Sequence, residues 1–444
     1  MASIVRAQLF HTPADPFFEA DALESFDDGA VAFDDGVITA SGDYRDVSAA
    51  HPDATVLDRR GSILLPGFVD THVHYPQVPV IGTMGLTLLN WLEQRTLPHE
   101  ERFSEEAFAR EQARVFLGCL AANGTTTALV FGAHFAGAMN GFFAEADRSG
   151  LRICAGVTVA DRLLTQALLT TPERAVRDSV ALIERWHLRG RLRYAVTPRF
   201  ALSCSEELLA ACGEVFSATT GLLFTSHINE TVDEVGAVAE LFPSSDDYLG
   251  TYERHRLVTR QSVLAHNVHP TQSELTRLAA AEASVAHCPS SNIFLGSGLF
   301  PLRAHVAAGV RVSLGSDVGG GTGLSMLKEG LCAYEHQMLL GGDGQALNPE
   351  HLLYLSTRAG ALALGLSEVV GDFSPGRAAD LVLITPPERA TLSEVLRHSS
   401  SAQATLGALF ALAREESIAE VYVAGEPLPA LRQAAEVPED ERDG

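Results

Sequence analysis

Short apolar runs recur through the middle of the chain, and longer amphipathic segments separate them. The first run begins at Leu64, and seven more occupy residues 125–131, 152–159, 192–198, 222–228, 262–267, 283–289 and 311–317. The intervening segments, such as 105–123 and 172–188, carry apolar residues at steps of three and four, as helices packed on a sheet do. Because alternating strands and helices form parallel sheets and eight repeats can close one, the pattern predicts an α/β protein with a (β/α)8 TIM-like barrel.

The two ends of the chain show short β-prone runs broken by turn residues. Near the N-terminus, Asp35 and Gly36 separate two such runs as a hairpin turn would, and strand patterns return after about residue 370. We expect both ends to pair into one small β-sandwich domain beside the barrel. The predicted division is 1–63 for the N-terminal part, 64–368 for the barrel, and 369–444 for the C-terminal part with its tail.

Composition and charge narrow the class of partner. The 444 residues are 46% hydrophobic, which is enough for a large core, and the net charge of −24 opposes docking onto nucleic acid or anionic lipid. Neither a secretory signal nor a run of 18 apolar residues is found, so we expect a cytoplasmic protein that does not enter membranes. The six cysteines lack Cys-x-x-Cys spacing and are expected as buried thiols. A small-molecule ligand is the remaining expectation.

Polar residues stand where several of the predicted strands end. The stretch "LLPGFVDTHVHYPQ" finishes with His72 and His74, whose side chains point the same way because side chains alternate along a strand. Other predicted strands end close to Arg199, His227, His266 and Asp317. Barrel enzymes assemble their sites at this edge, so these residues are expected to converge.

Three imidazoles and a carboxylate suit Zn²⁺, with Fe²⁺ as the second choice. Such an ion lowers the pKa of a bound water, and Glu230, three residues beyond His227, is the candidate general acid/base. His266 is either a further ligand or the residue that holds the hydroxide and orients Asp317. Binuclear barrel hydrolases use a lysine after strand 4, but the sole lysine is Lys328, so one metal per chain is favoured.

The motifs together resemble the amidohydrolase superfamily and, within it, the guanine deaminase family. The motifs are "PGFVDTHVHYPQ", "LLNWLEQRTLPHE", "NGTTTA", "VTPRFALSCSEELL", "SHINET", "AHCPSSNIFLGSGLFPL" and "GSDVGGGTGLSML". The resemblance implies one zinc ion on His72, His74, His227 and Asp317. It also implies Glu230 as proton shuttle, His266 and Asp317 at the reacting water, and Gln77, Arg199 and Phe200, with His74 and His227, around a purine. The implied reaction converts guanine to xanthine and ammonia, in a homodimer.

Two alternatives stay open at this point. One is a mononuclear amidohydrolase that deaminates another purine, a pterin or an aminotriazine, although Gln77, Arg199 and Phe200 favour guanine. The other is a barrel that binds a ligand without chemistry, which the complete set of metal ligands and Glu230 oppose. Trp91 either covers the substrate or belongs to an apolar helix face, and His287 is expected to make a structural hydrogen bond.

Overall fold

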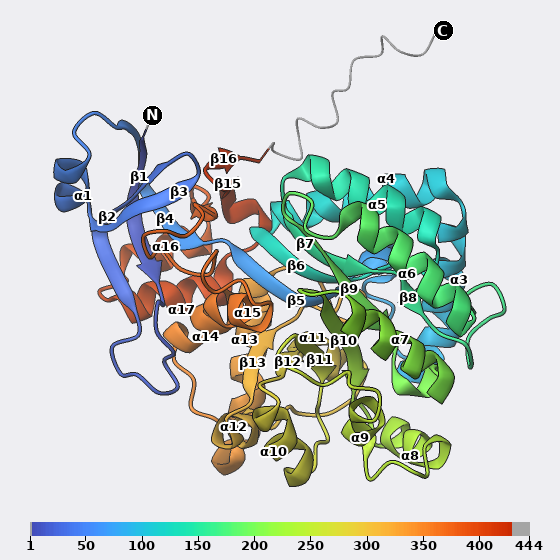
Figure 1. The fold of residues 1–444 in the computed structure, drawn as a ribbon. Coiled ribbons are helices and arrows are strands. Elements are labelled where there is room, and N and C mark those ends of the chain that lie inside the picture. Colours follow the sequence, from blue (N-terminus) through green and yellow to red (C-terminus); the bar gives the residue numbers. More distant parts are fainter. Residues whose placement is uncertain (1, 429–444) are drawn as a thin grey trace, which may run out of the picture.

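The computed structural model describes residues 2–428, and most of them build a barrel of eight parallel strands (Figure 1). In sheet order the strands are β5 (Phe68–His74), β6 (Thr125–Phe131), β7 (Arg152–Gly156), β9 (Leu192–Pro198), β10 (Leu223–Ile228), β11 (Ser262–His266), β12 (Ser284–His287) and β13 (Arg311–Leu314), with the short β8 (Thr158–Val159) beside β9. Each of the eight predicted runs contains one of these strands. The predicted (β/α)8 barrel is therefore confirmed.

The first and last barrel strands meet through side chains and the loop after β13. The Thr71 hydroxyl donates to the backbone oxygen of Leu314 at 2.8 Å and lies 2.9 Å from the Ser313 hydroxyl. Beyond β13, the backbone N–H of Asp317 donates to the oxygen of His72 at 2.8 Å. These contacts bring two predicted metal ligands, which lie 245 residues apart in the chain (317 − 72), onto neighbouring strand ends.

Helices cover the outside of the barrel, and several begin with a side-chain cap. They are α4 (Glu106–Ala122), α5 (Ala136–Ser149), α6 (Pro172–Trp186), α7 (Glu206–Ala218), α8 (Val232–Leu241), α9 (Tyr248–Glu253), α10 (Gln272–Ala280), α11 (Pro289–Phe294), α12 (Leu302–Ala308), α13 (Met326–Leu339), α14 (Pro349–Ser356) and α15 (Arg358–Ala363). Thr231 and Thr271 form capping boxes with Glu234 and Glu274, which satisfy backbone N–H groups that a helix leaves free at its start. No described helix has the length and apolarity to cross a bilayer.

A long excursion follows β5 before the first large helix. It contains the short helical segments η1 (Tyr75–Val80), α2 (Leu88–Trp91), η2 (Leu92–Thr96), α3 (Leu97–Glu100) and η3 (Glu101–Ser104). Another single turn, η4 (Ala201–Ser203), follows β9. These segments lie at the carboxyl ends of their strands, which is where loops of a barrel shape its site.

The two ends of the chain pair into one seven-stranded sheet, as predicted. Its order is β16 (Glu426–Pro427), β15 (Ile418–Val423), β14 (Leu381–Ile384), β4 (Thr55–Pro66), β1 (Ser3–His11), β2 (Glu24–Asp34) and β3 (Val37–Asp43), with α1 (Tyr44–Ala50), α16 (Thr391–Arg397) and α17 (Ala402–Leu412) packed nearby. Asp35 and Gly36 connect β2 to β3 with φ angles of 49° and 75°, so the predicted hairpin is confirmed. Residues 429–444 of the predicted C-terminal part lie outside the described residues.

The run that begins at Leu64 is two strands rather than one, which corrects the prediction. Leu64–Pro66 end β4 and pair with β14, whereas the barrel strand begins at Phe68. Gly67 lies between them, and a Cβ at this position would lie 2.2 Å from the Thr126 hydroxyl oxygen. The chain can pass from one sheet to the other here because Gly67 has no side chain. The division at residues 63–64 and 368–369 stays a prediction.

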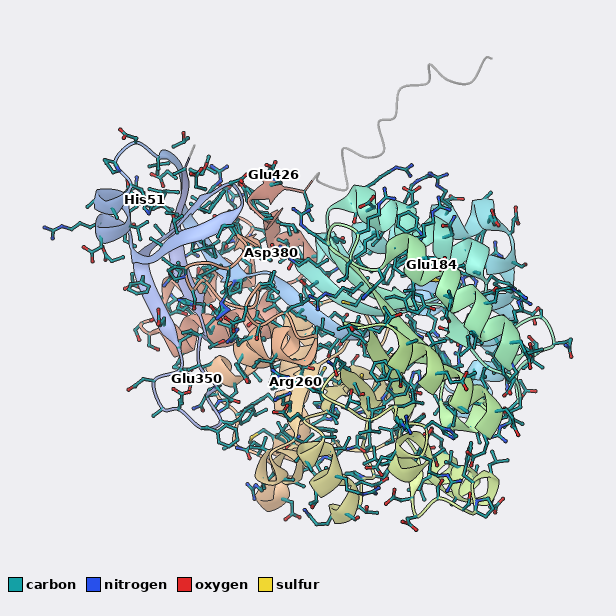
Figure 2. The ribbon with its side chains drawn as sticks, in the orientation of Figure 1. His51, Glu184, Arg260, Glu350, Asp380 and Glu426 are labelled. Atoms are coloured by element: carbon teal, nitrogen blue, oxygen red, sulfur yellow. The ribbon has the colours of Figure 1, made fainter. Side chains whose placement is uncertain are left out.

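An ion pair between Arg152 and Asp380 joins the small sheet to the amino end of the barrel. Figure 2 labels Asp380 between the two. Arg152, the first residue of β7, donates from Nε to Asp380 Oδ2 at 2.8 Å, and the backbone N–H of Ala424 donates to Asp380 Oδ1 at 2.8 Å. Asp380 is 4% exposed. The carboxylate is therefore shared between a barrel strand and the sheet.

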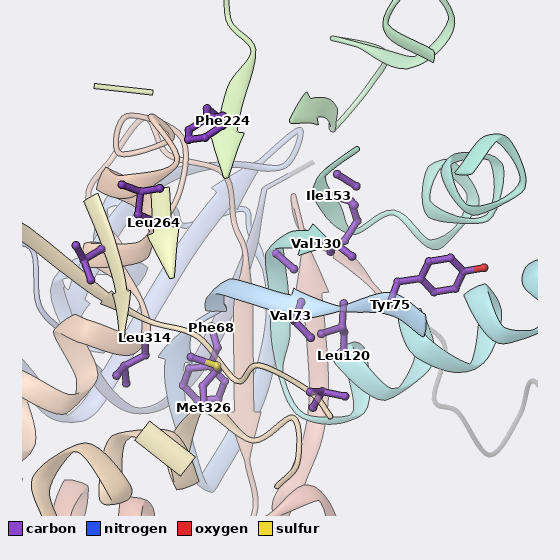
Figure 3. Close-up of a cluster of buried hydrophobic side chains, with 14 of the residues drawn as sticks. Phe68, Val73, Tyr75, Leu120, Val130, Ile153, Phe224, Leu264, Leu314 and Met326 are labelled. Atoms are coloured by element: carbon purple, nitrogen blue, oxygen red, sulfur yellow. The ribbon is translucent and has the colours of Figure 1, made fainter. Parts of the chain in front are cut away.

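Apolar side chains fill the molecule in two layers. The outer layer, between strands and helices, includes Phe68, Val73, Val130, Ile153 and Phe224 (Figure 3). The inner layer fills the amino end of the barrel with side chains from successive strands, and residues of the segment after α15 pack against them. The members of this layer include Val69, Leu129, Cys154, Ala195, Val263, Leu364 and Leu366. The interior of the barrel is therefore apolar at its amino end, and its polar residues lie at the carboxyl end.

All six cysteines are free thiols, as expected. Cys154, Cys204, Cys212 and Cys288 are buried, whereas Cys119 and Cys332 are half-buried, which corrects the expectation for those two. Burial raises the pKa of Cys154 to about 11, so this thiol stays protonated and unreactive near neutral pH.

Candidate active site

A cavity opens at the carboxyl end of the barrel. Its lining contains His74, Gln77, Leu88, Trp91, Leu92, Arg199, Phe200, His227, Glu230, His266, Leu295 and Asp317. Eight of the nine residues that the sequence singled out are in this set. The ninth, His72, is completely buried, and its Nε2 lies 3.1 Å from Asp317 Oδ1.

His72, His74, His227 and Asp317 form a cluster, called the metal quartet below, whose ligand atoms all lie within 4.8 Å of one another. Asp317 Oδ1 lies 3.1 Å from Nε2 of both His72 and His74, and Nε2 of His74 and His227 are 3.3 Å apart. Tetrahedral ligands about 2.0–2.2 Å from zinc are separated from one another by about 3.3–3.5 Å. The spacing of the quartet therefore fits one divalent ion.

The protonation of the quartet also suits a metal. His227 Nδ1 faces the backbone oxygen of Arg199, so this nitrogen donates and leaves the lone pair of Nε2 free. His72 Nδ1 has no hydrogen-bond partner among the described residues, His72 Nε2 faces Asp317 Oδ1, and burial lowers the pKa of His72 to about 4. Burial would raise the pKa of Asp317, but hydrogen bonds from His72 and His74 hold it well below its ordinary value. Neutral imidazoles facing an ionised carboxylate are the donor set that Zn²⁺ prefers.

Glu230 and His266 lie beside the quartet and face each other. Glu230 Oε2 lies 3.5 Å from His266 Nε2, and Glu230 Oε1 accepts a hydrogen bond from the Ser297 hydroxyl at 2.9 Å. Burial raises the pKa of Glu230 to about 7, a value suited to both accepting and giving a proton near neutral pH. The carboxyl group thus lines the cavity beside the metal quartet and is held in one orientation.

The position of His266 favours one of its two predicted roles. Its Nδ1 donates to Asn292 Oδ1 at 3.0 Å, and its Nε2 lies 3.7 Å from Asp317 Oδ2. It is not part of the metal quartet, but with His72 and Cys288 it forms a second set of potential ligand atoms that lie close together. This arrangement favours a residue that orients Asp317 over a fifth ligand.

The backbone at the site is held in uncommon conformations. Asn229, His266, Asn267 and Asp317 have φ angles of 48°, 73°, 49° and 47°, which non-glycine residues adopt rarely. All four follow or end barrel strands. Such residues cluster at functional sites, where the surrounding structure holds a side chain in a direction that a regular strand would not give.

Asp70 is a supporting residue that the sequence prediction missed. The pairing of β5 with β6 slips between Asp70 and Val73, as at a β-bulge, and His72 lies inside this irregular stretch. Asp70 is completely buried and accepts from the backbone N–H of His72 at 3.1 Å and of Ser316 at 3.0 Å. It therefore ties the strand of the first two ligands to the loop of the fourth. The sequence signal for this role was a carboxylate two residues before His72, on the same face of the strand.

The predicted substrate residues Gln77 and Arg199 line the cavity, but a carboxylate missed by the sequence prediction holds both. Glu100 Oε2 accepts from Arg199 Nη1 at 2.6 Å, and Glu100 Oε1 accepts from Gln77 Nε2 at 2.8 Å. His134 Nε2 lies 3.2 Å from Arg199 Nη1 and 3.3 Å from Glu100 Oε2. Burial would raise the pKa of Glu100, but Arg199 and His134 hold it below its ordinary value. Arg199 is thus paired with a buried carboxylate as well as lining the cavity.

Aromatic and apolar residues complete the wall. Phe200 lines the cavity with its ring centroid 6.2 Å from that of His227. Trp91 is both in the lining and packed in a small apolar cluster with Val80, Leu88 and Leu295, so both of its suggested roles fit its position. His287 corrects a prediction: its ring stacks on Phe300 at 4.2 Å, and neither nitrogen has a hydrogen-bond partner among the described residues.

Known proteins resemble the chain over almost its whole length. The amidohydrolase family profile matches residues 63–428, and an imidazolonepropionase-like composite domain of bacteria matches residues 29–54. The probable guanine deaminase of Deinococcus radiodurans is 58% identical over 427 residues, covering 95% of this chain and 97% of that protein.

Two solved structures of guanine deaminases are similar as well. The E. coli enzyme matches with a TM-score of 0.91 and 35% identity, over 97% of this chain and 99% of that one. The C. acetobutylicum enzyme, solved with guanine in its active site, matches with a TM-score of 0.88 and 25% identity, over 97% of this chain and 100% of that one.

The barrel with its metal quartet defines a metal-dependent hydrolase, and the chain belongs to the amidohydrolase family. Within that family, the relatives just described are guanine deaminases, so the resemblance found in the sequence motifs is confirmed.

Proposed function

We propose that the protein is a guanine deaminase, which hydrolyses guanine to xanthine and ammonia. One observation carries the proposal: a single cavity brings residues of the metal quartet together with the carboxylate of Glu230 and with Gln77, Arg199 and Phe200, which offer hydrogen-bond donors and an aromatic face to a purine. The guanine bound in the C. acetobutylicum relative supports the same substrate. Removal of ammonia from guanine also makes purine catabolism the expected setting.

One Zn²⁺ ion per chain is the proposed cofactor, with Fe²⁺ as the second choice. The quartet offers four ligands for one ion, and the sole lysine, Lys328, lies on α13, where its ammonium contacts the Thr322 hydroxyl instead of a metal site. When bound, the ion supplies a water of lowered pKa for attack on the ring.

The side chains of the chain move the protons. In this proposal Glu230 accepts a proton from the attacking water and gives it to a ring nitrogen next to C2. It then takes the proton of the new hydroxyl on C2 and gives it to the amino group, which leaves as ammonia while the carbonyl of xanthine forms. His266, held by Asn292, keeps the carboxylates of Glu230 and Asp317 in place around the reacting carbon. Phe200 contacts the face of the purine, and Gln77 and Arg199 bind its edge.

The test is ammonia release from a panel of guanine, adenine, a pterin and an aminotriazine by the zinc-loaded protein. Guanine should give the highest kcat/KM, with xanthine as the product on chromatography. Glu230→Gln serves as the control for contaminating deaminases, because it keeps the shape of the site. A preference for another member of the panel, or binding without turnover, would overturn the proposal.

Three further expectations belong to the same proposal. The homodimer that the family resemblance implies is tested by light scattering after size exclusion. Six free thiols are consistent with a reducing compartment and so support a cytoplasmic location. Limited proteolysis tests the division into 1–63, 64–368 and 369–444, because cleavage near the proposed boundaries should leave a barrel fragment.

A further inference from the structure

Glu100 is a buried carboxylate that touches two residues of the proposed substrate wall without being part of the cavity lining itself. It ends α3, is 2% exposed, and stands behind Gln77 and Arg199. Its Oε1 accepts hydrogen bonds from Gln77 and Arg199, and its Oε2 accepts one from Arg199. A group in this position can act on the substrate only through the two side chains that it holds.

The contacts of Gln77 determine which way its amide points. Glu100 is ionised and can only accept, so the amide nitrogen must face it, 2.8 Å from Oε1. On the other side, the backbone N–H of Gly319 can only donate, so the amide oxygen must face it, and the distance is 3.0 Å. The reversed amide would place a donor against a donor and an acceptor against a carboxylate. The orientation is therefore imposed by two neighbours rather than chosen by the substrate.

This orientation changes what Gln77 offers to a ligand. Gly319 takes one of the two acceptor positions of its carbonyl oxygen, and one of its two N–H groups remains after the bond to Glu100. Arg199 has five N–H donors, of which the contacts with Glu100 use two. The fixed amide thus adds its remaining N–H to a wall in which the guanidinium can only donate.

We propose that Glu100 is a positioning residue that sets specificity: by holding Gln77 and Arg199 together as donors, it makes the wall select an acceptor at position 6 of the purine. The inference rests on the proposed function. Guanine carries an oxygen at position 6, which accepts, whereas an amino group there would face donors and leave them without partners. Sites of this kind reject the wrong analogue by up to about 10⁴-fold.

The probe is 2,6-diaminopurine, which keeps the 2-amino group of guanine and replaces the oxygen at position 6 by an amino group. The ratio of kcat/KM for guanine and for 2,6-diaminopurine measures the preference, with products identified by chromatography. In Glu100→Gln, which keeps the shape but loses the charge, the amide of Gln77 is free to turn. We expect the preference for guanine to narrow by at least about tenfold, mainly through a higher KM for guanine, with metal content unchanged.

Two further variants separate positioning from general destabilisation. Asp380→Asn is the matched control, because Asp380 is also a buried carboxylate paired with an arginine, at the other end of the barrel. It should lower the thermal midpoint and leave the preference unchanged. In a Gln77→Leu background, Glu100→Gln should narrow the preference by a smaller factor than in the parent, because part of its action passes through Gln77.

The outcomes distinguish this inference from the proposed function. A parent protein that does not deaminate guanine overturns the proposed function and the inference with it. If the parent prefers guanine and Glu100→Gln has the same ratio of kcat/KM for guanine and 2,6-diaminopurine, only the inference is overturned. If Glu100→Gln does not fold, Glu100→Asp carries the test: the carboxylate is kept but is one methylene too short to reach both partners, and an unchanged preference again overturns the role of Glu100.

Discussion

Two buried pairs of a carboxylate and an arginine mark opposite ends of the barrel, and only one of them faces a cavity. Arg152 and Asp380 join the amino end to the small sheet, next to the apolar inner layer. Arg199 and Glu100 lie at the carboxyl end, where Arg199 lines the cavity. The same kind of contact therefore serves attachment at one end and, in our proposal, substrate selection at the other.

The surroundings of the two pairs explain the difference. At the amino end, side chains from successive strands and the segment after α15 fill the interior with apolar groups. At the carboxyl end, the interior holds the metal quartet, Glu230 and His266, and the backbone adopts positive φ angles at several strand ends. Packing at one end offsets the cost of burying polar groups at the other, and substitutions at the two ends should have separable effects.

The largest effect on activity is expected from the metal quartet. Asp317→Asn removes the only negative charge among the four ligands, so the protein should lose its metal on dialysis and its guanine turnover with it. Elemental analysis and ammonia release measure both. Two equivalents of metal retained by the parent after dialysis would contradict the single site, and full activity of the metal-free variant would contradict the role of the quartet.

Glu230→Gln is expected to lower turnover without releasing the metal. A positioned general acid/base contributes about 10²- to 10⁴-fold to rate, and the amide cannot carry the proton. The bond from the Ser297 hydroxyl can still form to the amide oxygen, so the geometry should be kept. Steady-state kinetics and elemental analysis on one preparation test this. Near-normal turnover would mean that another group carries the proton.

A smaller effect on activity is expected from Arg199→Lys, which keeps a positive charge beside Glu100 but loses the planar set of donors. The preference for guanine over adenine should narrow, by roughly 10- to 100-fold, because fewer donors face position 6. Arg199→Ala would be a poorer test, since it would leave Glu100 buried without its partner. An undiminished preference in Arg199→Lys would remove Arg199 from substrate selection.

The smallest effect on activity is expected from Asp380→Asn at the amino end. Breaking a buried ion pair costs roughly 3–5 kcal/mol of stability, because the remaining charge loses its partner. Denaturant unfolding should show this loss while kcat/KM for guanine stays within about twofold of the parent, since well-separated sites act almost independently. A large change in kcat/KM would mean that the two ends are coupled through the barrel.

The sequence by itself determined the barrel and most of its site. The apolar runs recur with helical segments between them, and a strand must bury its apolar residues, so each run contains one strand of the barrel. The predicted ligands converge because all parallel strands of a barrel end at the same rim. A polar residue at the end of a predicted strand can therefore be assigned to this rim from the sequence.

Tertiary structure alone decided the partners of these residues. Glu100 lies 23 residues from Gln77 and 99 from Arg199, in an excursion of short helical turns that no periodicity predicts. The break at Gly67 likewise depends on Thr126, which approaches only once both sheets have formed. Hydrogen-bond partners depend on distances and directions of a few tenths of an ångström, which packing of the whole chain sets. A local pattern carries the type of a residue and the face it occupies, but not the atom that it meets.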